Sequence, residues 1–439
     1  MHKMPRPTQQ PRQRAFLVGA ELPGEVSSLP VEDSLSELAL LAETAGLAVV
    51  GRLSQKLRRI DPKTFLGSGK IEEVKALAEE QAADIILFDD ELSPRHQREL
   101  EEILPQDFRI LDRTALILDI FAQHASTREG SLQVELAQYQ YRLPRLTRAW
   151  THLARQAGGG GGRSGSTGGV GLRGPGETQL EVDRRMIGRR ISQLKDELEK
   201  VRQHRRRHRA RRKKAEIHTV ALVGYTNAGK STLLNRLSGA EVYVADQLFA
   251  TLDPTTRRVE LPSGQEMLLT DTVGFIQKLP TMLVAAFRAT LEEITEAEML
   301  LHVVDVTHPN MLAQAEAVRD TLEEIDGLGV PRITALNKID LMPDPGEAVD
   351  VVDEFERAIP VSAKTGEGVD QLLDILEHEL LDQLLQIVVR LPYDHGRLIS
   401  LFHEHGIVDL LNQGEESVLI KGRIPVQFKD EFSAFIEAS

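Results

Sequence analysis

The residue types and spacing best suited to chemistry lie in the segment 224–231, which reads GYTNAGKS. It matches the phosphate-loop pattern G-x-x-x-x-G-K-[ST], follows an apolar stretch at 218–223 and precedes a helical pattern. In a strand, loop and helix of this kind, backbone N–H groups and the helix N-terminus surround the phosphates of a nucleotide. Lys230 would then reach the β and γ phosphates, and the Ser231 hydroxyl would ligate Mg²⁺.

Two later segments indicate which base is bound. NKID, Asn337 to Asp340, follows the apolar run 333–336, and SAK, Ser362 to Lys364, closes another expected strand. At the carboxyl ends of these strands, Asp340 can accept from N1–H and the 2-amino group of guanine, and a SAK backbone N–H can donate to guanine O6. Adenine lacks that donor pair and would leave a buried carboxylate unpaired. The pattern therefore predicts a guanine nucleotide.

Between these segments lies LLTDTVG, residues 268–274. Asp271 would hold Mg²⁺ through water, and the Gly274 N–H would contact the γ-phosphate. The next residue is Phe275, at the position where Ras-like enzymes place a glutamine that orients the attacking water. Because an apolar side chain cannot orient water, we expect slow hydrolysis without help from a partner or from elsewhere in the chain.

The elements that position these residues belong to a chain of 439 residues, which is too long for one core and predicts two to four domains. The sequence has no cysteine, which excludes disulfides, zinc-thiolate sites and thiol nucleophiles. The start of the chain has no apolar signal region, and nowhere do 18 apolar residues follow one another. We therefore expect a cytoplasmic protein without a membrane span.

The first 131 residues alternate between strand and helix patterns, which predicts a small α/β domain. Expected strands cover 16–22, 48–53 and 84–89, and expected helices cover 34–45 and 70–82, with a third from Pro94. GSGK at 67–70 lacks the full spacing of a phosphate loop and is more typical of a helix start. Whether this domain binds a second nucleotide is left open by the sequence.

Two apolar stripes flank a glycine-rich stretch in which 11 of the 19 residues from Gly158 to Gly176 are glycine. Steps of four and three residues favour an antiparallel helical hairpin with the glycines at its tip. Pro144 should interrupt the first helix, and Gly188 should weaken the second. The alternative is two helices on a domain core, joined by a disordered loop. The stripes consist of Leu132, Leu136, Tyr139, Leu143, Leu146, Trp150 and Leu153, and of Leu180, Ile187, Ile191, Leu194, Leu198 and Val201.

Charge is distributed unevenly. Residues 142–214 contain 21 Lys and Arg against 6 Asp and Glu, an excess of +15, so the rest of the chain carries −29 within a net charge of −14. The run QHRRRHRARRKK at 203–214 is the densest part. A basic module in an acidic protein predicts a polyanionic partner, most commonly nucleic acid. The alternative for the run is a solvated helix face.

The motifs GYTNAGKS, FATLDPT, DTVGF, NKID and SAK, together with LRRIDPKTFLGSGKIEEV and GPGETQLEVDRR, resemble HflX, a bacterial GTPase family of the Obg-HflX group. GPGETQLEVDRR is the family-specific part. The resemblance implies a cytoplasmic GTPase that binds the large ribosomal subunit and splits stalled ribosomes during stress. It also implies that the loop between the two long helices approaches the peptidyl transferase centre, and that Thr251 is the switch threonine. Thr255 and Thr256 are the alternatives for that role.

These arguments define the candidate residues. Catalytic candidates are Lys230, Thr251 and Gly274, and Mg²⁺ ligands are Ser231, Thr251 and Asp271. RNA-binding candidates are Arg163, Arg205, Arg206, Arg207, Arg209, Arg211 and Arg212. The nucleotide-binding set is Gly224, Tyr225, Thr226, Asn227, Ala228, Gly229, Lys230, Ser231, Phe249, Ala250, Thr251, Leu252, Asp253, Asp271, Thr272, Val273, Gly274, Asn337, Lys338, Ile339, Asp340, Ser362, Ala363 and Lys364.

The expected organisation is an N-terminal α/β domain (1–131), a helical hairpin (132–214), a Ras-like P-loop GTPase domain (215–382) and a small α+β C-terminal domain (383–439). The expected ligands are GTP, GDP and Mg²⁺, the expected partner is the large ribosomal subunit with its RNA, and the expected state is a monomer. Two other functions fit the same residues: a ribosome-assembly or RNA-remodelling GTPase, and a regulatory binding protein that uses GTP as a switch.

Overall fold

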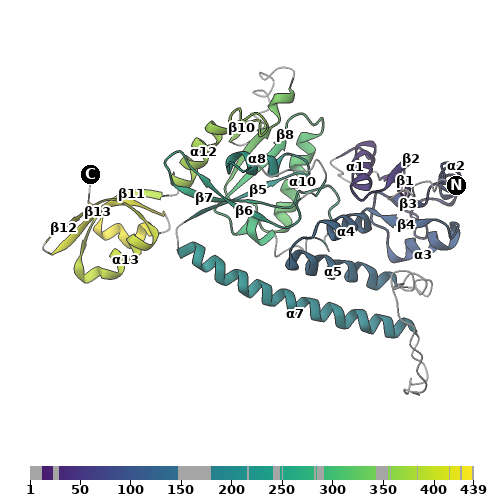
Figure 1. Ribbon diagram of the computed structural model, residues 1–439, viewed down its shortest axis with the longest axis horizontal. Coiled ribbons are helices and arrows are strands. Elements are labelled where there is room, and N and C mark those ends of the chain that lie inside the picture. Colours follow the sequence, from purple (N-terminus) through teal and green to yellow (C-terminus); the bar gives the residue numbers. More distant parts are fainter. Residues whose placement is uncertain are drawn as a thin grey trace, which may run out of the picture.

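In the described part of the chain, the computed structural model contains three β-sheets and a pair of packed helices (Figure 1). The structure describes residues 12–22, 29–146, 179–214, 217–240, 248–249, 251–280, 283, 291–342, 354–355, 357–382, 384–414, 416–425 and 428–437. Among the helices of these ranges, none has an apolar stretch of the length that crosses a membrane. The expected mixed α/β fold with a P-loop domain is confirmed.

The N-terminal sheet has the strand order β2-β1-β3-β4, and all neighbouring strands are parallel. β1 and β3 are almost entirely buried, as expected for a parallel sheet covered by helices. The structure adds β4 and α4, which the sequence pattern did not predict. The elements are β1 (Arg14–Glu21), α1 (Val31–Thr44), β2 (Ala48–Lys56), α2 (Ser68–Glu80), β3 (Ile85–Phe88), α3 (Pro94–Ile103), β4 (Arg109–Asp112) and α4 (Arg113–His124).

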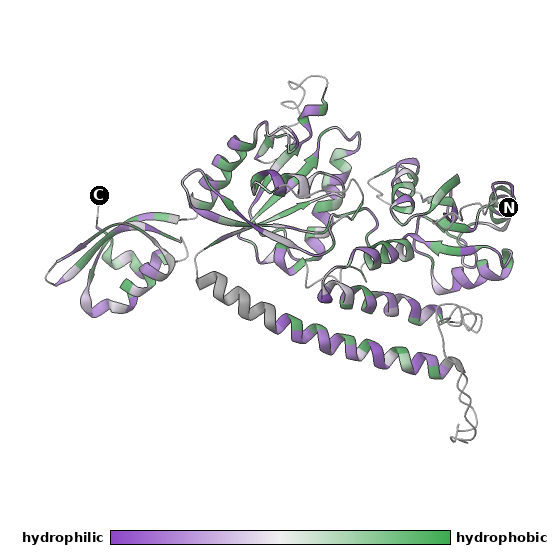
Figure 2. Ribbon diagram, viewed as in Figure 1, coloured by the Kyte–Doolittle hydropathy of each residue, from purple (hydrophilic) through white to green (hydrophobic). Residues whose placement is uncertain are grey.

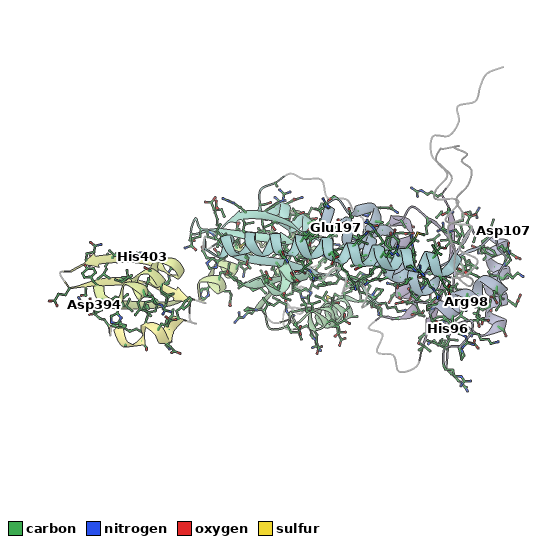
Figure 3. All side chains as sticks on the ribbon, turned by 90° about the horizontal axis from the view of Figure 1, so that it is seen from below. His96, Arg98, Asp107, Glu197, Asp394 and His403 are labelled. Carbon is green, nitrogen blue, oxygen red and sulfur yellow. The ribbon has the colours of Figure 1, made fainter. Side chains whose placement is uncertain are left out.

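The helical hairpin consists of α5 (Arg128–Arg142) and α7 (Gln179–Lys214), which run antiparallel. Arg128 pairs with Glu197 at 3.2 Å, and Glu135 pairs with Arg190 at 2.8 Å, so seven residues forward on α5 match seven residues back on α7. Figure 3 shows α7 with Glu197 lying across the N-terminal and GTPase parts. Between the helices Leu132, Leu136, Leu194 and Leu198 are buried, with Tyr139 and Ile191 packed against them.

The predicted seam is therefore confirmed for Leu132, Leu136 and Tyr139 on α5 and for Ile191, Leu194 and Leu198 on α7. The other described members of the predicted stripes, which are Leu143, Leu146, Ile187 and Val201, do not belong to this cluster. Trp150, Leu153 and the side chain of Leu180 lie outside the described part of the chain.

α5 ends at Arg142, and Pro144 lies in the 3-10 turn Leu143–Arg145. The end of the α-helix just before Pro144 is expected, because proline has no N–H to donate within a helix. Gly188 does not interrupt α7, whose 36 residues correspond to a length of about 54 Å.

The GTPase sheet has the order β10-β9-β8-β5-β7-β6, with parallel neighbours except for β6 and β7. Figure 2 shows apolar residues concentrated in its strands. The carboxyl ends of the parallel strands share one edge, where the loops that carry the motifs begin. The elements are β5 (His218–Gly224), α8 (Lys230–Leu237), β6 (Thr255–Glu260), β7 (Glu266–Asp271), β8 (Met299–Asp305), α10 (Met311–Glu324), β9 (Arg332–Asn337), β10 (Ala358–Pro360) and α12 (Val369–Asp382).

The C-terminal part is a three-stranded antiparallel sheet of order β11-β13-β12. Alternate residues of the strands, among them Val389 and Ile420, are buried with Phe402 and Phe432 from the helices. This is the expected small α+β unit. Its elements are β11 (Leu384–Pro392), α13 (Gly396–His405), β12 (Ile407–Gln413), β13 (Ser417–Pro425) and α14 (Lys429–Phe432).

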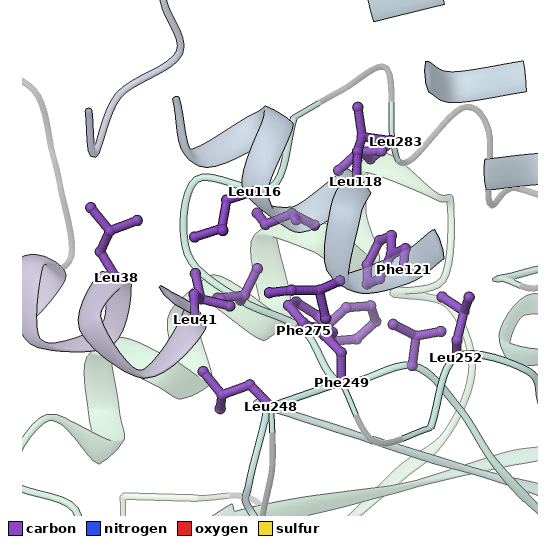
Figure 4. Close-up of a cluster of buried hydrophobic side chains, with 14 of the residues drawn as sticks. Leu38, Leu41, Leu116, Leu118, Phe121, Leu248, Phe249, Leu252, Phe275 and Leu283 are labelled. Carbon is purple, nitrogen blue, oxygen red and sulfur yellow. The ribbon is translucent and has the colours of Figure 1, made fainter. Parts of the chain in front are cut away.

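A single hydrophobic cluster joins the N-terminal helices to the GTPase part (Figure 4). Leu41 of α1 and Phe121 of α4 belong to it together with Phe249 and Phe275 from loops beside the phosphate loop. The rings of Phe121 and Phe249 meet edge to face at 4.7 Å. The helices of the N-terminal part therefore bury apolar residues against the GTPase part as well as against their own sheet. The loops next to the nucleotide motifs belong to this shared core.

Candidate nucleotide site

The phosphate loop connects the end of β5 to the start of α8, and its backbone requires glycine at two positions. Gly229 has φ +99° and Gly224 has φ +152°, regions that residues with a side chain rarely adopt. A Cβ on Gly224 would collide with the Val303 carbonyl oxygen, and one on Gly229 with Asn337 Nδ2. Asn227 adopts the left-handed conformation with φ 61°. The motif is thus folded as a tight loop that opens a helix, the geometry that surrounds phosphate.

Lys230 lies buried inside this loop. Its Nζ donates to the carbonyl oxygens of Gly224 at 3.0 Å and Tyr225 at 2.8 Å. Burial lowers the pKa of Lys230 to about 8, although the nearby Asp271 carboxylate opposes this shift. A cation that is stripped of water in this way gains strongly from a phosphate placed beside it.

Three oxygen-bearing side chains meet at the start of α8. The Ser231 hydroxyl donates to Asp271 Oδ2 at 2.6 Å, and the Ser231 and Thr251 hydroxyl oxygens lie 3.0 Å apart. Adjacent ligands of an octahedral Mg²⁺, each at about 2.1 Å, are separated by about 3.0 Å. Asp271 Oδ1 is buried and has no hydrogen-bond partner among the described residues. These residues therefore fit a hard divalent cation.

The acidic side chains around this position are few. Within the described ranges, no three His, Cys, Asp or Glu side chains gather as a metal site. A cation beside Ser231 would therefore depend on hydroxyls, one carboxylate, water and the nucleotide's own phosphates, which is typical of Mg²⁺. Burial raises the pKa of Asp271, and Lys230 and Ser231 counteract that rise.

The structure distinguishes the three candidate threonines. The Thr256 hydroxyl pairs with that of Thr270 at 2.9 Å across β6 and β7, and Thr255 is exposed at the start of β6. Thr251 faces Ser231 instead. The geometry favours Thr251 for a role at the cation.

The base motifs come together at the ends of β9 and β10. Asn337 Nδ2 donates to the Ala228 carbonyl at 2.8 Å, and its Oδ1 accepts from the Ala363 N–H at 2.9 Å. Asn337 thus ties the phosphate loop to SAK. Asp340 Oδ1 accepts from the buried Ser362 hydroxyl at 2.6 Å, which orients the carboxylate and leaves Oδ2 for a ligand.

Arg236 of α8 is a supporting residue that sequence reasoning missed. It donates to the carbonyl oxygens of Ala363, at 3.2 Å, and Lys364. Lys338, at φ 71°, pairs its Nζ with Asp305 at the end of β8 at 2.7 Å. Both interactions fix the loops that carry the base motifs. The sequence around Arg236 contains no pattern that would predict its contact with the SAK loop.

Gly274 and Phe275 pass directly beneath the phosphate loop. A Cβ on Gly274 would lie 2.9 Å from Thr226 Cα and 3.0 Å from Lys230 Nζ, so a glycine is needed for this close approach. Phe275 is 1% exposed and exchanges backbone hydrogen bonds with Gly224 and Thr226. Its ring belongs to the shared core and has no polar group.

Several residues of the predicted nucleotide-binding set direct their side chains elsewhere. The Tyr225 hydroxyl donates to Glu37 and accepts from the Gln277 N–H, and the Thr272 hydroxyl donates to the Leu222 carbonyl at 2.6 Å. Five others have side chains that are buried in hydrophobic clusters or, for Asp253, bonded to Ser126 and Thr127. They are Phe249, Leu252, Asp253, Val273 and Ile339.

Other candidates cannot be placed. Ala250 and Arg163 lie outside the described residues. Six arginines lie on α7, whose backbone is described as far as Lys214, but their side chains are outside the described part. They are Arg205, Arg206, Arg207, Arg209, Arg211 and Arg212.

An ion-pair network between the N-terminal sheet and the loop after Gly274 was also missed. Arg113, 1% exposed, pairs with Asp89 at 2.6 Å and Glu37 at 2.5 Å and donates to the Gln277 carbonyl at 3.3 Å. Lys278 pairs with the same Asp89 at 2.6 Å. Burial alone would raise the pKa of Asp89, but the two cations outweigh it and lower the pKa to about 2.

The sheet order, with the phosphate loop after its central strand β5, defines a P-loop nucleotide-binding protein, and the joined NKID and SAK loops are those of the guanine-nucleotide class. Known families cover most of the chain. "GTP-binding GTPase N-terminal" matches residues 32–122, "GTP-binding GTPase Middle Region" matches 124–212, "50S ribosome-binding GTPase" matches 219–338 and "HflX C-terminal domain" matches 348–432.

Individual relatives agree with this assignment. The chain is 46% identical over 425 residues to GTPase HflX of Caldanaerobacter subterraneus subsp. tengcongensis, covering 97% of this chain and 94% of that one. It is 45% identical over 396 residues to GTPase HflX of Escherichia coli strain K12, covering 90% of each. The chain belongs to the HflX family and is a GTP-hydrolysing enzyme.

Among solved structures, the chain is similar to a GTP-binding protein from the hyperthermophilic archaeon Sulfolobus solfataricus in complex with GDP. It is 24% identical, and the match covers 83% of this chain and 98% of that one, with a TM-score of 0.43.

Proposed function

We propose that this protein is a cytoplasmic GTPase that binds the large ribosomal subunit and splits stalled ribosomes under stress, hydrolysing GTP to GDP and phosphate. The observation that carries the proposal is the antiparallel pairing of α5 and α7. The α5 C-terminus and the α7 N-terminus lie at the same end of the pair, and at the other end α7 leads into β5 of the GTPase sheet. The glycine-rich sequence 158–176 lies between these two helix ends in the chain.

The hairpin combines reach with charge. Its longer arm corresponds to about 54 Å, and its sequence carries the basic excess of the chain. Glycine has no side chain and bends freely, which suits a tip that enters a confined RNA site. The basic helix adds affinity for the phosphate backbone around that site. The description of the matched GTPase family, a 50S ribosome-binding GTPase, supports the same partner.

In the GTP site, Ser231, Thr251 and Asp271 would hold Mg²⁺. The ion supplies positive charge that neutralises the β and γ phosphates during hydrolysis. Lys230 neutralises the same phosphates from the loop, and the Gly274 backbone N–H donates to the γ-phosphate. Asp340, held by Ser362, selects guanine, and Asn337 keeps the base loop and the phosphate loop in register.

Attacking water requires an orienting group, and Phe275 does not provide one at the position after Gly274. Its ring is buried in the core shared with the N-terminal helices. We infer that the free enzyme hydrolyses GTP slowly and that the ribosome completes the site. Hydrolysis would then follow productive binding.

One experiment separates this proposal from its alternatives. The GTPase rate and the dissociation of subunits are measured with intact ribosomes, with free large subunits and with no ribosome. Splitting predicts that intact ribosomes dissociate in the presence of a GTP analogue and that ribosomes stimulate hydrolysis. Preference for free or precursor subunits without dissociation would indicate an assembly factor. A GTPase rate that ribosomes do not change would contradict both the splitting and the assembly function, and would favour a regulatory protein that uses GTP as a switch.

A further inference from the structure

Asp253 lies two residues after Thr251 and is bound by the N-terminal helices. Its Oδ2 accepts from the Ser126 N–H, the Ser126 hydroxyl and the Thr127 N–H, each at 2.8 Å, and its Oδ1 accepts from the Thr127 hydroxyl. These donors form the junction between α4 and α5. A carboxylate at the start of α5 is also favoured by the helix dipole.

The junction is shaped for this carboxylate. Gly130 lies in the first turn of α5 with no positive φ, so its backbone does not require glycine. A Cβ at this position would overlap Asp253 Oδ1. Glycine inside a helix is unfavourable relative to alanine, so its presence here is explained by the space that Asp253 occupies.

A second anchor lies on the other side of Thr251. The Phe249 ring packs edge to face against Phe121 of α4 at 4.7 Å and is 3% exposed. Thr251 is therefore bracketed by two residues fixed to α4 and α5. Two residues of chain span at most about 7 Å, so these anchors confine the Thr251 hydroxyl to the neighbourhood of Ser231. The observed separation of 3.0 Å between the two hydroxyl oxygens is consistent with that restraint.

We propose that Asp253 is a positioning residue for the GTP reaction: bound by the α4–α5 junction, it holds Thr251 beside Ser231 and thereby favours GTP over GDP. The inference rests on the role proposed above for Thr251. An interaction made through the cation and the γ-phosphate exists with GTP and is absent with GDP, so removal of the anchor weakens binding of GTP selectively.

The coupling acts in both directions. If the contact of Asp253 with the α4–α5 junction raises the affinity for GTP, then bound GTP must stabilise that contact by the same factor. The docked residue bonds to Thr127, whose hydroxyl also accepts from the Gly130 N–H at 3.0 Å and caps α5. GTP therefore orders the first turn of one arm of the hairpin, which links the nucleotide to the element proposed to contact RNA.

The test compares binding of fluorescent GTPγS and GDP by the full-length protein. Gly130→Ala places a methyl group in the Asp253 position without removing a polar group, and Asp253→Ala removes the carboxylate. Gly188→Ala is the matched control, because it is the same change in helix α7 at a position with nothing within 4 Å of the added carbon. Thr251→Ala tests the role on which the inference depends.

We expect Gly130→Ala and Asp253→Ala each to weaken GTPγS binding about tenfold, within the usual range of coupling between sites, and to change GDP binding less than about twofold. The double variant should be no weaker than Asp253→Ala, because the methyl group then has room. Gly188→Ala should match the parent. Hydrogen exchange at the first turn of α5 should be slower with GTPγS than with GDP in the parent, and equal in Asp253→Ala.

Equal weakening of both nucleotides, or additive effects in the double variant, would show a general structural defect and overturn the proposal. If Thr251→Ala loses the preference for GTPγS while both anchor variants keep it, the role of Thr251 stands and that of Asp253 falls. If Thr251→Ala keeps the preference, both roles fall. None of these outcomes depends on the ribosome.

Discussion

The hydroxyl oxygens of Ser231 and Thr251 lie 3.0 Å apart, although the two residues are 20 positions apart in the chain. Ser231 lies in the first turn of α8, and Thr251 comes from the segment that packs on α4. The separation is that of neighbouring ligands around Mg²⁺. A loop that carries a threonine to this position brings the segment around it into the range of the γ-phosphate.

Thr251→Ala should therefore reduce kcat for GTP on the order of 100-fold, the usual cost of losing one group that stabilises developing charge. GDP affinity should stay near that of the parent. Thr256→Ala is the matched control, because its hydroxyl pairs with Thr270 between two strands. Single-turnover hydrolysis and nucleotide titration measure both effects. Equal losses in the two variants would argue against the assignment.

Asp340→Asn should change the base that is bound. The substitution replaces an acceptor with a donor opposite position 2 of the purine, so GTP affinity should fall about 100- to 10,000-fold while xanthosine triphosphate becomes a ligand. Ser362 can still donate to the remaining side-chain oxygen, so the loop should keep its form. Competition binding with the two triphosphates is the measurement, and unchanged GTP affinity would show that Asp340 does not contact the base.

The sequence predicted the parts of the molecule that depend on local pattern. The phosphate loop, NKID and the apolar stripe from Leu132 to Tyr139 each occupy at most eight consecutive residues. Their residue spacing was therefore enough to predict them. α4 was missed because RILDRTALILDIF runs from β4 into the helix without a break, although Asp112 caps the helix by accepting from the Ala115 N–H at 2.8 Å.

Interactions between distant segments had no such signal. Arg113 and the Gln277 carbonyl are 164 residues apart, and Asp253 and Ser126 are 127 apart. Sequence reasoning assigned Asp253 to the nucleotide because it lies in FATLDPT. Its actual partners depend on how the N-terminal helices pack on the GTPase part, which no short motif records.

The ion pairs of Asp89 make the association between these parts sensitive to acid. The pKa is lowered from 3.8 to about 2 in the folded protein, so the carboxylate stabilises it by about 2 kcal/mol above pH 4, and this is lost as the pH falls from 4 to 2. Asp89→Asn should lower the melting temperature at pH 7, and the difference from the parent should shrink towards pH 2.

The control for that experiment is Asp107→Asn, since Asp107 is exposed on the N-terminal part (Figure 3). Its melting temperature should follow that of the parent throughout. A difference between parent and Asp89→Asn that stays constant from pH 7 to pH 2 would show that the ionised carboxylate does not stabilise the fold.

The basic run should contribute affinity that depends on salt. Reversing several of its arginines to glutamate should weaken binding to the large subunit and lower the slope of log K against log salt by roughly one for each RNA phosphate that is no longer neutralised. Nucleotide affinity should remain nearly that of the parent. Equal slopes for the variant and the parent would show that the run is a solvated helix face that does not contact RNA. The arginines are Arg205, Arg206, Arg207, Arg209, Arg211 and Arg212.

The most direct test of the proposed function concerns the glycine-rich sequence between the arms of the hairpin. Replacing 158–174 with a tight turn removes the proposed tip but keeps α5, α7 and the GTP site. Folding, GTP binding and much of the charge-driven affinity for the large subunit should survive. Moderate shortening of a simple connection costs little, because closure entropy varies slowly with loop length.

The measurement is sedimentation of intact ribosomes incubated with the GTP-bound variant and with the parent. We predict that the parent converts ribosomes to separate subunits and that the shortened variant leaves them intact while still binding. Full splitting by the shortened variant would contradict the proposed function and show that these glycines are only a connection.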